Sequence, residues 1–141
     1  MNKIIKLQEL SKLINEIDRI RNKRNIILLF GDLGAGKTTF VRKYCDFLGI
    51  KDVVSSPSFL ILNTYEFKNV VINHLDLYRV KNEEELDTIG LFDILENNPN
   101  LIFIEWPDNY LNLLKKYQKK ILCIYFKFIE DNINAREIDI K

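Results

Sequence analysis

A glycine-rich turn between two apolar segments is the feature that most constrains this chain. Residues 31–38 read Gly-Asp-Leu-Gly-Ala-Gly-Lys-Thr and match the pattern G-x-x-x-x-G-K-[ST]. Glycines let the backbone curl so that successive N–H groups point at phosphate oxygens, and the helix that follows presents its N-terminus to the same anion. The lysine of this pattern reaches the outer phosphates, and the hydroxyl residue ligates Mg²⁺. The pattern therefore predicts a site for a nucleoside triphosphate with Mg²⁺, held by Lys37 and Thr38.

The segments on either side of residues 31–38 supply the structural context that this pattern needs. Ile26–Phe30 is a continuous apolar run, typical of a strand that is buried on both faces of a parallel sheet. Lys37–Leu48 reads as a helix that stops at Gly49. A strand thus enters the loop and a helix leaves it, which favours phosphate binding over a glycine loop that merely turns the chain.

The rest of the chain alternates between strand and helix patterns. Leu7–Ile20 carries apolar residues at helical spacing, and Asn82 before three glutamates predicts a helix that runs toward Gly90. A short helix is expected over Asn109–Tyr117. Further strands are predicted at Phe59–Phe67, Val70–Tyr78, Leu101–Trp106, Ile121–Ile129 and Arg136–Ile140. These elements predict an α/β fold like that of P-loop NTPases, with a largely parallel central sheet flanked by helices and some antiparallel strands.

Length and composition limit the remaining possibilities. At 141 residues the chain is expected to form a single domain over residues 1–141. The 21 basic and 20 acidic residues nearly balance, which does not favour an autonomous nucleic-acid binder. Cys45 and Cys123 are too few for a disulfide scaffold and belong to no zinc-binding pattern. No apolar run approaches the ~18 residues of a membrane span, so we expect a cytoplasmic protein.

Two carboxylates are candidates for the acidic partner of the Mg²⁺ site. Glu105 ends the apolar run that begins at Leu101, and a glutamate there can hold Mg²⁺ or polarise the attacking water. Asp76 shares one face of a predicted strand with His74 and Tyr78. The spacing alone does not divide the roles between Asp76 and Glu105. His74 by itself is a weak candidate for a base and is equally explained as a half-buried structural histidine.

The triphosphate pattern does not specify the reaction. The guanine-specifying motif N-K-x-D is absent from the sequence, which favours ATP over GTP. Hydrolysis of ATP is one possibility. A small-molecule kinase and a non-catalytic adaptor whose partner affinity depends on nucleotide remain alternatives.

Four short motifs, taken together and in order, resemble one family. They are Gly31–Thr39, Ser56–Phe59, His74–Arg79 and Glu105–Pro107. In this combination and at this spacing the chain resembles the TsaE family, also called YjeE. The resemblance implies an ATPase that binds ATP and Mg²⁺, hydrolyses ATP slowly and is monomeric or weakly oligomeric when alone. It further implies TsaD and TsaB as partners, which transfer a threonylcarbamoyl group to an adenosine of tRNA, so that tRNA is reached only through the complex.

The resemblance also implies roles for individual residues. Lys37 contacts phosphates, Thr38 ligates Mg²⁺, and Asp76 and Glu105 are linked to Mg²⁺ and hydrolysis. Trp106 shapes either the nucleotide site or a partner surface. The other residues expected around the nucleotide are Gly34, Ala35, Gly36, Thr39, Ser58 and Arg136.

Ser58 is a departure from the family pattern, because it replaces the usual threonine of S-P-T-[FY]. The hydroxyl is kept, while the lost methyl leaves the position less restrained. We expect ATP with Mg²⁺ to order the segment Ser56–Phe59, and hydrolysis to release it, as in other γ-phosphate switches.

Overall fold

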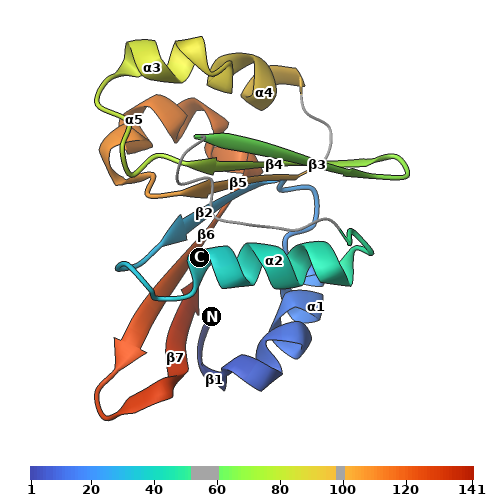
Figure 1. The fold of residues 1–141 in the computed structure, drawn as a ribbon, viewed down its shortest axis with the longest axis vertical. Helices are drawn as coiled ribbons and strands as arrows, with labels where there is room; N and C mark the ends of the chain where they lie inside the picture. The colour runs from blue at the N-terminus through green and yellow to red at the C-terminus, as the bar shows by residue number, and fades with distance from the viewer. Residues whose placement is uncertain (52–60, 98–100) are drawn as a thin grey trace.

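A mixed sheet forms the centre of the molecule (Figure 1). The computed structural model describes residues 1–51, 61–97 and 101–141, and within them the sheet has seven strands in the order β1-β7-β6-β2-β5-β4-β3. The strands are β1 (Asn2–Lys6), β2 (Ile26–Phe30), β3 (Leu62–Phe67), β4 (Val70–Asp76), β5 (Leu101–Glu105), β6 (Ile121–Ile129) and β7 (Asn132–Ile140). The four inner strands β6, β2, β5 and β4 are parallel, and β1, β7 and β3 are antiparallel to their neighbours. The predicted α/β architecture is confirmed.

Helices cover both faces of this sheet. They are α1 (Leu10–Ile20), α2 (Lys37–Phe47), α3 (Glu83–Thr88), α4 (Leu91–Asn97) and α5 (Leu111–Leu114). Short 3₁₀ segments span Leu7–Glu9, Asp108–Tyr110 and Lys115–Lys120. Figure 1 shows α1 and α2 on one face of the sheet and α3, α4 and α5 on the other. No helix within the described ranges is long and apolar enough to cross a membrane.

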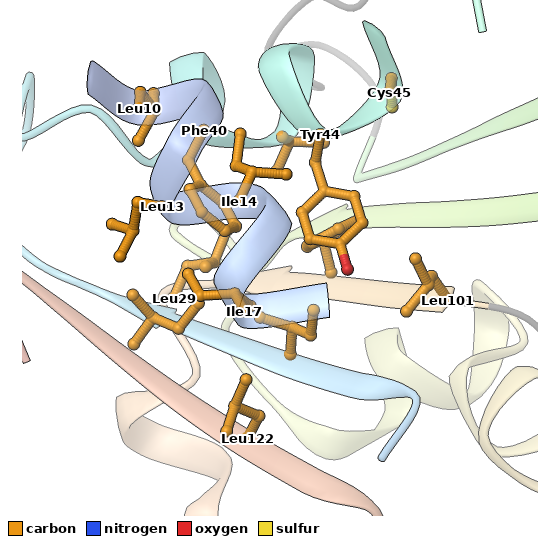
Figure 2. Close-up of a cluster of buried hydrophobic side chains, with 14 of the residues drawn as sticks. Leu10, Leu13, Ile14, Ile17, Leu29, Phe40, Tyr44, Cys45, Leu101 and Leu122 are labelled. Atoms are coloured by element: carbon orange, nitrogen blue, oxygen red, sulfur yellow. The ribbon is translucent and has the colours of Figure 1, made fainter. Parts of the chain in front are cut away.

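The alternation of side chains along β2 separates two apolar cores. Ile27 and Leu29 pack toward α1 and α2, whereas Ile26 and Leu28 pack toward the opposite helices. Figure 2 shows the first of these cores, where the side chains of α1 and α2 converge over the sheet. Its labelled members include Leu10, Leu13, Ile14, Ile17, Phe40 and Tyr44 from the helices. Both faces of β2 are buried, which is the physical reason for its unbroken apolar sequence.

The same alternation determines where the polar residues of β4 and β5 point. Ile72 of β4 and Phe103 of β5 belong to the core under α1 and α2. Residues two positions further along a strand share its face, so His74, Asp76 and Glu105 also face α2. Asp76 and Glu105 are direct register partners in the parallel β4–β5 pair. Two carboxylates therefore lie at one level, at the carboxyl ends of neighbouring strands.

The N-terminal segment differs from its expected structure. The helical spacing beginning at Leu7 predicts a helix there, but α1 begins only at Leu10, and Asn2–Lys6 forms a strand on the edge of β7. The Glu9 carboxylate accepts the Lys6 N–H at 2.8 Å and helps to end the strand. This conformation depends on pairing with a strand at the far end of the chain, as in Asn2 with Asp139, and the periodicity of a short segment gives no sign of such pairing.

Smaller differences occur elsewhere. The predicted helix after Asn82 corresponds to α3, which ends at Thr88. Gly90 adopts φ +77° and is followed by a second helix, α4, that was not predicted from the sequence. The helix expected over Asn109–Tyr117 is a sequence of 3₁₀ and α turns. The last strand starts four residues before the expected Arg136, and β4 ends at Asp76. Residues 59–60 of the expected Phe59–Phe67 strand lie outside the described residues.

Candidate functional site

The loop over residues 31–38 joins β2 to α2 and depends on glycine at defined positions. Gly31, Gly34 and Gly36 have φ values of +145°, +77° and +112°, which side-chain-bearing residues rarely adopt. A Cβ atom on Gly31 would lie 2.6 Å from the backbone oxygen of Phe126 in β6. The glycines therefore let the loop curl and let it approach the neighbouring strand.

The side chain of Lys37, the first residue of α2, lies against the backbone of the loop. Its Nζ donates hydrogen bonds to the backbone oxygens of Gly31 and, at 3.1 Å, Asp32. Burial lowers the pKa of the Lys37 ammonium, and the carboxylates of Glu105 and Asp76 oppose that shift. The side chain thus places a cation beside the backbone groups that would surround a phosphate.

Glu105 connects the end of β5 to the start of α2. Its Oε1 accepts a hydrogen bond from the Thr38 hydroxyl at 2.9 Å and lies 2.7 Å from Nε2 of His74. Glu105 is 3% exposed and His74 is fully buried. A buried carboxylate is costly unless it is paired, and here two side chains share one of its oxygens.

Asp76 lies across the strand pair from Glu105 but in a more open position. It is half-buried, and its Oδ1 accepts the N–H of Tyr78 at 3.0 Å. The site thus contains one deeply buried and one accessible carboxylate at the same level of the sheet. Such a pair has different environments and can perform different roles.

Trp106 follows β5 directly and lies over the loop cation. Lys37 Nζ is 3.9 Å from the centroid of its ring, within the range of a cation–π interaction. The centroid of the Tyr78 ring lies 4.9 Å from that of the indole. Trp106 has φ +57°, an uncommon backbone conformation for a bulky residue. This turn brings the indole back toward the loop instead of continuing the strand.

Arg136 reaches the loop from the opposite side, on β7. Its Nε donates to the backbone oxygen of Ala35 at 3.1 Å, and its guanidinium lies 4.5 Å from the centroid of the Phe128 ring. A cavity of about 200 Å³ opens beside this contact. It is lined by residues of the loop, α2, β7 and the N-terminal segment, among them Gly34, Gly36, Thr39, Arg136, Ile5 and Leu7.

The residues that the sequence selected fall into two groups around the loop. Lys37, Thr38, Glu105, Asp76 and Trp106 gather on the β4–β5 side. The second group lines the cavity or contacts the loop beside it, and consists of Gly34, Ala35, Gly36, Thr39 and Arg136. Ser58 and the whole segment Ser56–Phe59 lie outside the described residues.

Sequence alone gives too little indication that His74 belongs to the site. It is fully buried rather than half-buried, and it lies against the very carboxylate that the site is built around. The available signal was its spacing of two from Asp76 on one strand, which places both residues on one face. The spacing gives no sign that Glu105 is close, because the β4–β5 register decides that proximity.

Comparison with known proteins gives a consistent family. A family model described as "Threonylcarbamoyl adenosine biosynthesis protein TsaE" matches residues 4–138. The tRNA threonylcarbamoyladenosine biosynthesis protein TsaE of Rickettsia conorii is 42% identical over 108 residues, covering 76% of this chain and 61% of its own length. The proteins of the same name from Borreliella burgdorferi and Haemophilus influenzae are 38% and 36% identical, covering 74% and 84% of this chain and 74% and 70% of their own lengths.

The match to the Rickettsia relatives leaves part of their length uncovered, about two fifths in Rickettsia conorii. Among solved structures, that of Bacillus subtilis YdiB superimposes with a TM-score of 0.63 over 98% of this chain and 82% of the other. Their sequences are 22% identical, so this likeness supports the fold alone. The family model and the relatives confirm the resemblance seen in the four motifs. The chain therefore belongs to the TsaE family of tRNA threonylcarbamoyladenosine biosynthesis proteins.

Proposed function

We propose that this chain is an accessory ATPase of tRNA threonylcarbamoyladenosine formation. It binds ATP with Mg²⁺ at residues 31–38, hydrolyses the ATP slowly, and acts with partners of the TsaD and TsaB type without transferring the threonylcarbamoyl group itself. It contacts tRNA through that complex. The observation that carries the proposal is the hydrogen bond between Thr38 and Glu105, which joins the phosphate loop to a carboxylate at the end of a neighbouring strand.

The donor set at this hydrogen bond fits Mg²⁺. Thr38 offers a hydroxyl oxygen and Glu105 a carboxylate, and Mg²⁺ prefers such hard oxygen ligands together with waters and substrate phosphates. When bound, the ion would neutralise charge that develops on the phosphate oxygens. The Thr38 hydroxyl oxygen could ligate the ion through a lone pair while its proton stays on Glu105, because a hydroxyl has one donor and two acceptor sites.

Lys37 supplies the positive charge of the site. Its ammonium is already buried beside the loop, held by backbone oxygens and the Trp106 ring. Phosphate oxygens would compete with Gly31 and Asp32 for the same donor. A preorganised cation in a water-poor site stabilises the charge of a transferring phosphoryl group more strongly than it would in water.

The environments of the two carboxylates support a division of roles. Glu105 is buried and bonded to Thr38, which suits the residue that holds the ion or its water. Asp76 is half-buried one strand away and suits the residue that orients the attacking water. Exchange of the two roles remains an outcome that variants can reveal.

The cavity beside Arg136 supports binding of the remainder of the nucleotide. Its walls are apolar at Ile5 and Leu7 and polar at Thr39, and Arg136 adds a cation. Ligand pockets combine mostly apolar walls with a few polar groups in this way. We assign this cavity to the base and ribose of ATP.

The test compares Lys37→Ala and Glu105→Gln with Glu66→Gln, a matched change at an exposed position of β3. We expect Lys37→Ala to lose ATP binding. Glu105→Gln should keep ATP bound and hydrolyse it at least about 10-fold more slowly in the presence of the partners. Glu66→Gln should match the parent in both measurements.

The same variants distinguish the rival functions. An adaptor that needs only bound ATP would keep tRNA modification in Glu105→Gln cells and lose it in Lys37→Ala cells. A small-molecule kinase would yield a phosphorylated product and turn over faster with its acceptor. The readout is the threonylcarbamoyladenosine content of tRNA, measured by mass spectrometry in cells depleted of the native protein. Unchanged content after depletion would remove the pathway assignment.

A further inference from the structure

The His74 side chain is buried in a way that apolar packing does not explain. It is fully buried in β4, with the Tyr65 ring of β3 6.3 Å from its own. Its Nδ1 has no hydrogen-bond partner among the described residues. Leaving a buried polar atom unpaired costs free energy, and an apolar side chain of similar size would avoid that cost. The other ring nitrogen must therefore supply the reason for a histidine here.

That other nitrogen contacts Glu105. His74 Nε2 lies 2.7 Å from Glu105 Oε1, which is within hydrogen-bond distance. An Nε2–H that donates to Glu105 suits a carboxylate acceptor, because an ionised carboxylate has no proton to give. A neutral ring with its proton on Nε2 has no N–H at Nδ1, which agrees with the lack of an acceptor near that atom among the described residues.

The two donors to Glu105 leave its oxygens unequal. Oε1 accepts from both Thr38 and His74, while Oε2 has no partner among the described residues. The carboxylate is thereby fixed in rotation from two sides, by α2 and by β4. The His74 contact from β4 holds Oε1 independently of the Thr38 hydroxyl on α2.

We infer that His74 is a positioning residue, whose Nε2–H fixes the Glu105 carboxylate so that Oε2 is available at the Mg²⁺ site. This inference rests on the proposed function. His74 does not reach the reacting atoms, since its ring is fully buried and its Nε2 is occupied by Glu105. Such partners of metal-linked residues commonly set ligand orientation, and losing them typically costs about 10- to 100-fold in metal affinity or activity.

The first test locates the proton on the ring. The chain contains a single histidine, so ¹⁵N-labelled histidine gives one imidazole in a two-dimensional NMR spectrum. We expect a proton on Nε2 in the native protein, and loss of that fixed preference in Glu105→Ala. A ring protonated on Nδ1 alone would overturn the inference. This measurement requires neither Mg²⁺ nor nucleotide, so it holds even if the proposed ATPase function fails.

The second test replaces His74 by two amide side chains of different length. The amide nitrogen of His74→Gln lies the same number of bonds from Cα as Nε2, whereas that of His74→Asn corresponds to Nδ1. We expect His74→Asn to raise the Mg²⁺ concentration needed for tight binding of a non-hydrolysable ATP analogue by about 10- to 100-fold. His74→Gln should stay closer to the native value. Binding of the analogue without Mg²⁺ should be equal in all three proteins.

The outcomes separate the two proposals. If the native protein binds the analogue identically with and without Mg²⁺, the proposed function fails, and the NMR result alone decides the contact of His74 with Glu105. If the native protein responds to Mg²⁺ and His74→Asn responds equally, the positioning role is wrong. Melting temperatures of both variants show whether a loss reflects folding, because a purely structural role would lower stability without changing the Mg²⁺ requirement.

Discussion

Gly31 approaches β6 more closely than any side chain would permit. Its missing Cβ would lie 2.6 Å from the Phe126 oxygen, and its φ is +145°. Gly36 also has a positive φ of +112°, but nothing lies within 4 Å of its missing Cβ. The loop therefore contains two glycines with different physical requirements. One needs both backbone freedom and space, and the other needs backbone freedom alone.

This difference predicts an order of stability for two alanine variants. Gly36→Ala should lose about 1–2 kcal/mol of unfolding free energy through backbone strain. Gly31→Ala should lose about 1–3 kcal/mol more, since the added methyl also displaces β6. Urea unfolding followed by circular dichroism measures both values. Equal losses would show that the loop withdraws from Phe126 without cost.

At the scale of elements, a polar contact joins α1 to α2. Tyr44 of α2 donates its hydroxyl to Asp18 of α1 at 2.6 Å, and Arg21 Nε donates to the same carboxylate oxygen at 2.8 Å. Burial opposes ionisation of Asp18, but these hydrogen bonds outweigh it and hold the pKa of the carboxyl below its ordinary value. The contact holds the helix that follows the phosphate loop against its neighbour.

A carboxyl pKa that is lower in the folded chain makes stability depend on pH. The folded state binds fewer protons here, so the Asp18 contribution is present above pH ~4 and is lost as the pH falls further. Asp18→Asn should be about 1 kcal/mol less stable than the parent at neutral pH. The two proteins should converge as the pH falls below the lowered pKa of Asp18, where both side chains are uncharged. A constant difference across this range would assign the effect to packing.

The edge strand β1 gives a second prediction for elements. It covers the outer edge of β7, and Ile5 contributes to the cavity beside the phosphate loop. Removing residues 1–6 should lower the melting temperature and promote aggregation, because an uncovered strand edge is a template for pairing with another chain. Light scattering at several protein concentrations tests this. A monomeric truncated chain with unchanged melting would contradict it.

The elements also show what sequence could and could not predict. Two elements could be predicted from nearby residues alone, the strand Ile26–Phe30 and the helix Lys37–Phe47. Burial on both faces gives the strand its continuous apolar sequence, and the glycine pattern directly precedes the helix. β1 could not be predicted in this way, because its pairing with β7 is non-local. The candidate acids Asp76 and Glu105 were found at strand ends, but their alignment and the contact with His74 depend on strand register. The periodicity of apolar residues indicates which face of the sheet a residue occupies. It does not indicate which residue of the neighbouring strand lies beside it.

At the scale of the whole molecule, the sheet separates the core that supports the site from one that does not. Phe40 of α2 packs against the sheet on the phosphate-loop side, next to Phe103 and Phe126. Leu86 of α3 is equally buried in the core on the other face. Both residues stabilise the same sheet, but only Phe40 belongs to the helix that begins at Lys37.

Truncation at these two positions should separate stability from binding. Phe40→Ala is expected to lose about 3–5 kcal/mol of unfolding free energy, and Leu86→Ala about 2–5 kcal/mol. Only Phe40→Ala should also weaken ATP binding at a temperature where both variants remain folded, because α2 would shift at the loop. Calorimetric titration with ATP measures this. Equal weakening in both variants would show that the two faces are coupled through the sheet.

The position of Trp106 should make its intrinsic fluorescence sensitive to the phosphate loop. It is the one tryptophan in the chain, and its indole lies 3.9 Å from the Lys37 ammonium. A charge so close to the ring alters the energy of its excited state, so movement of Lys37 toward a phosphate should change the colour or intensity of the emission. Lys37→Ala should start from a different spectrum and remain silent when ATP is added. Ultraviolet light alone would then follow the loop in real time, without any label on the protein or the nucleotide.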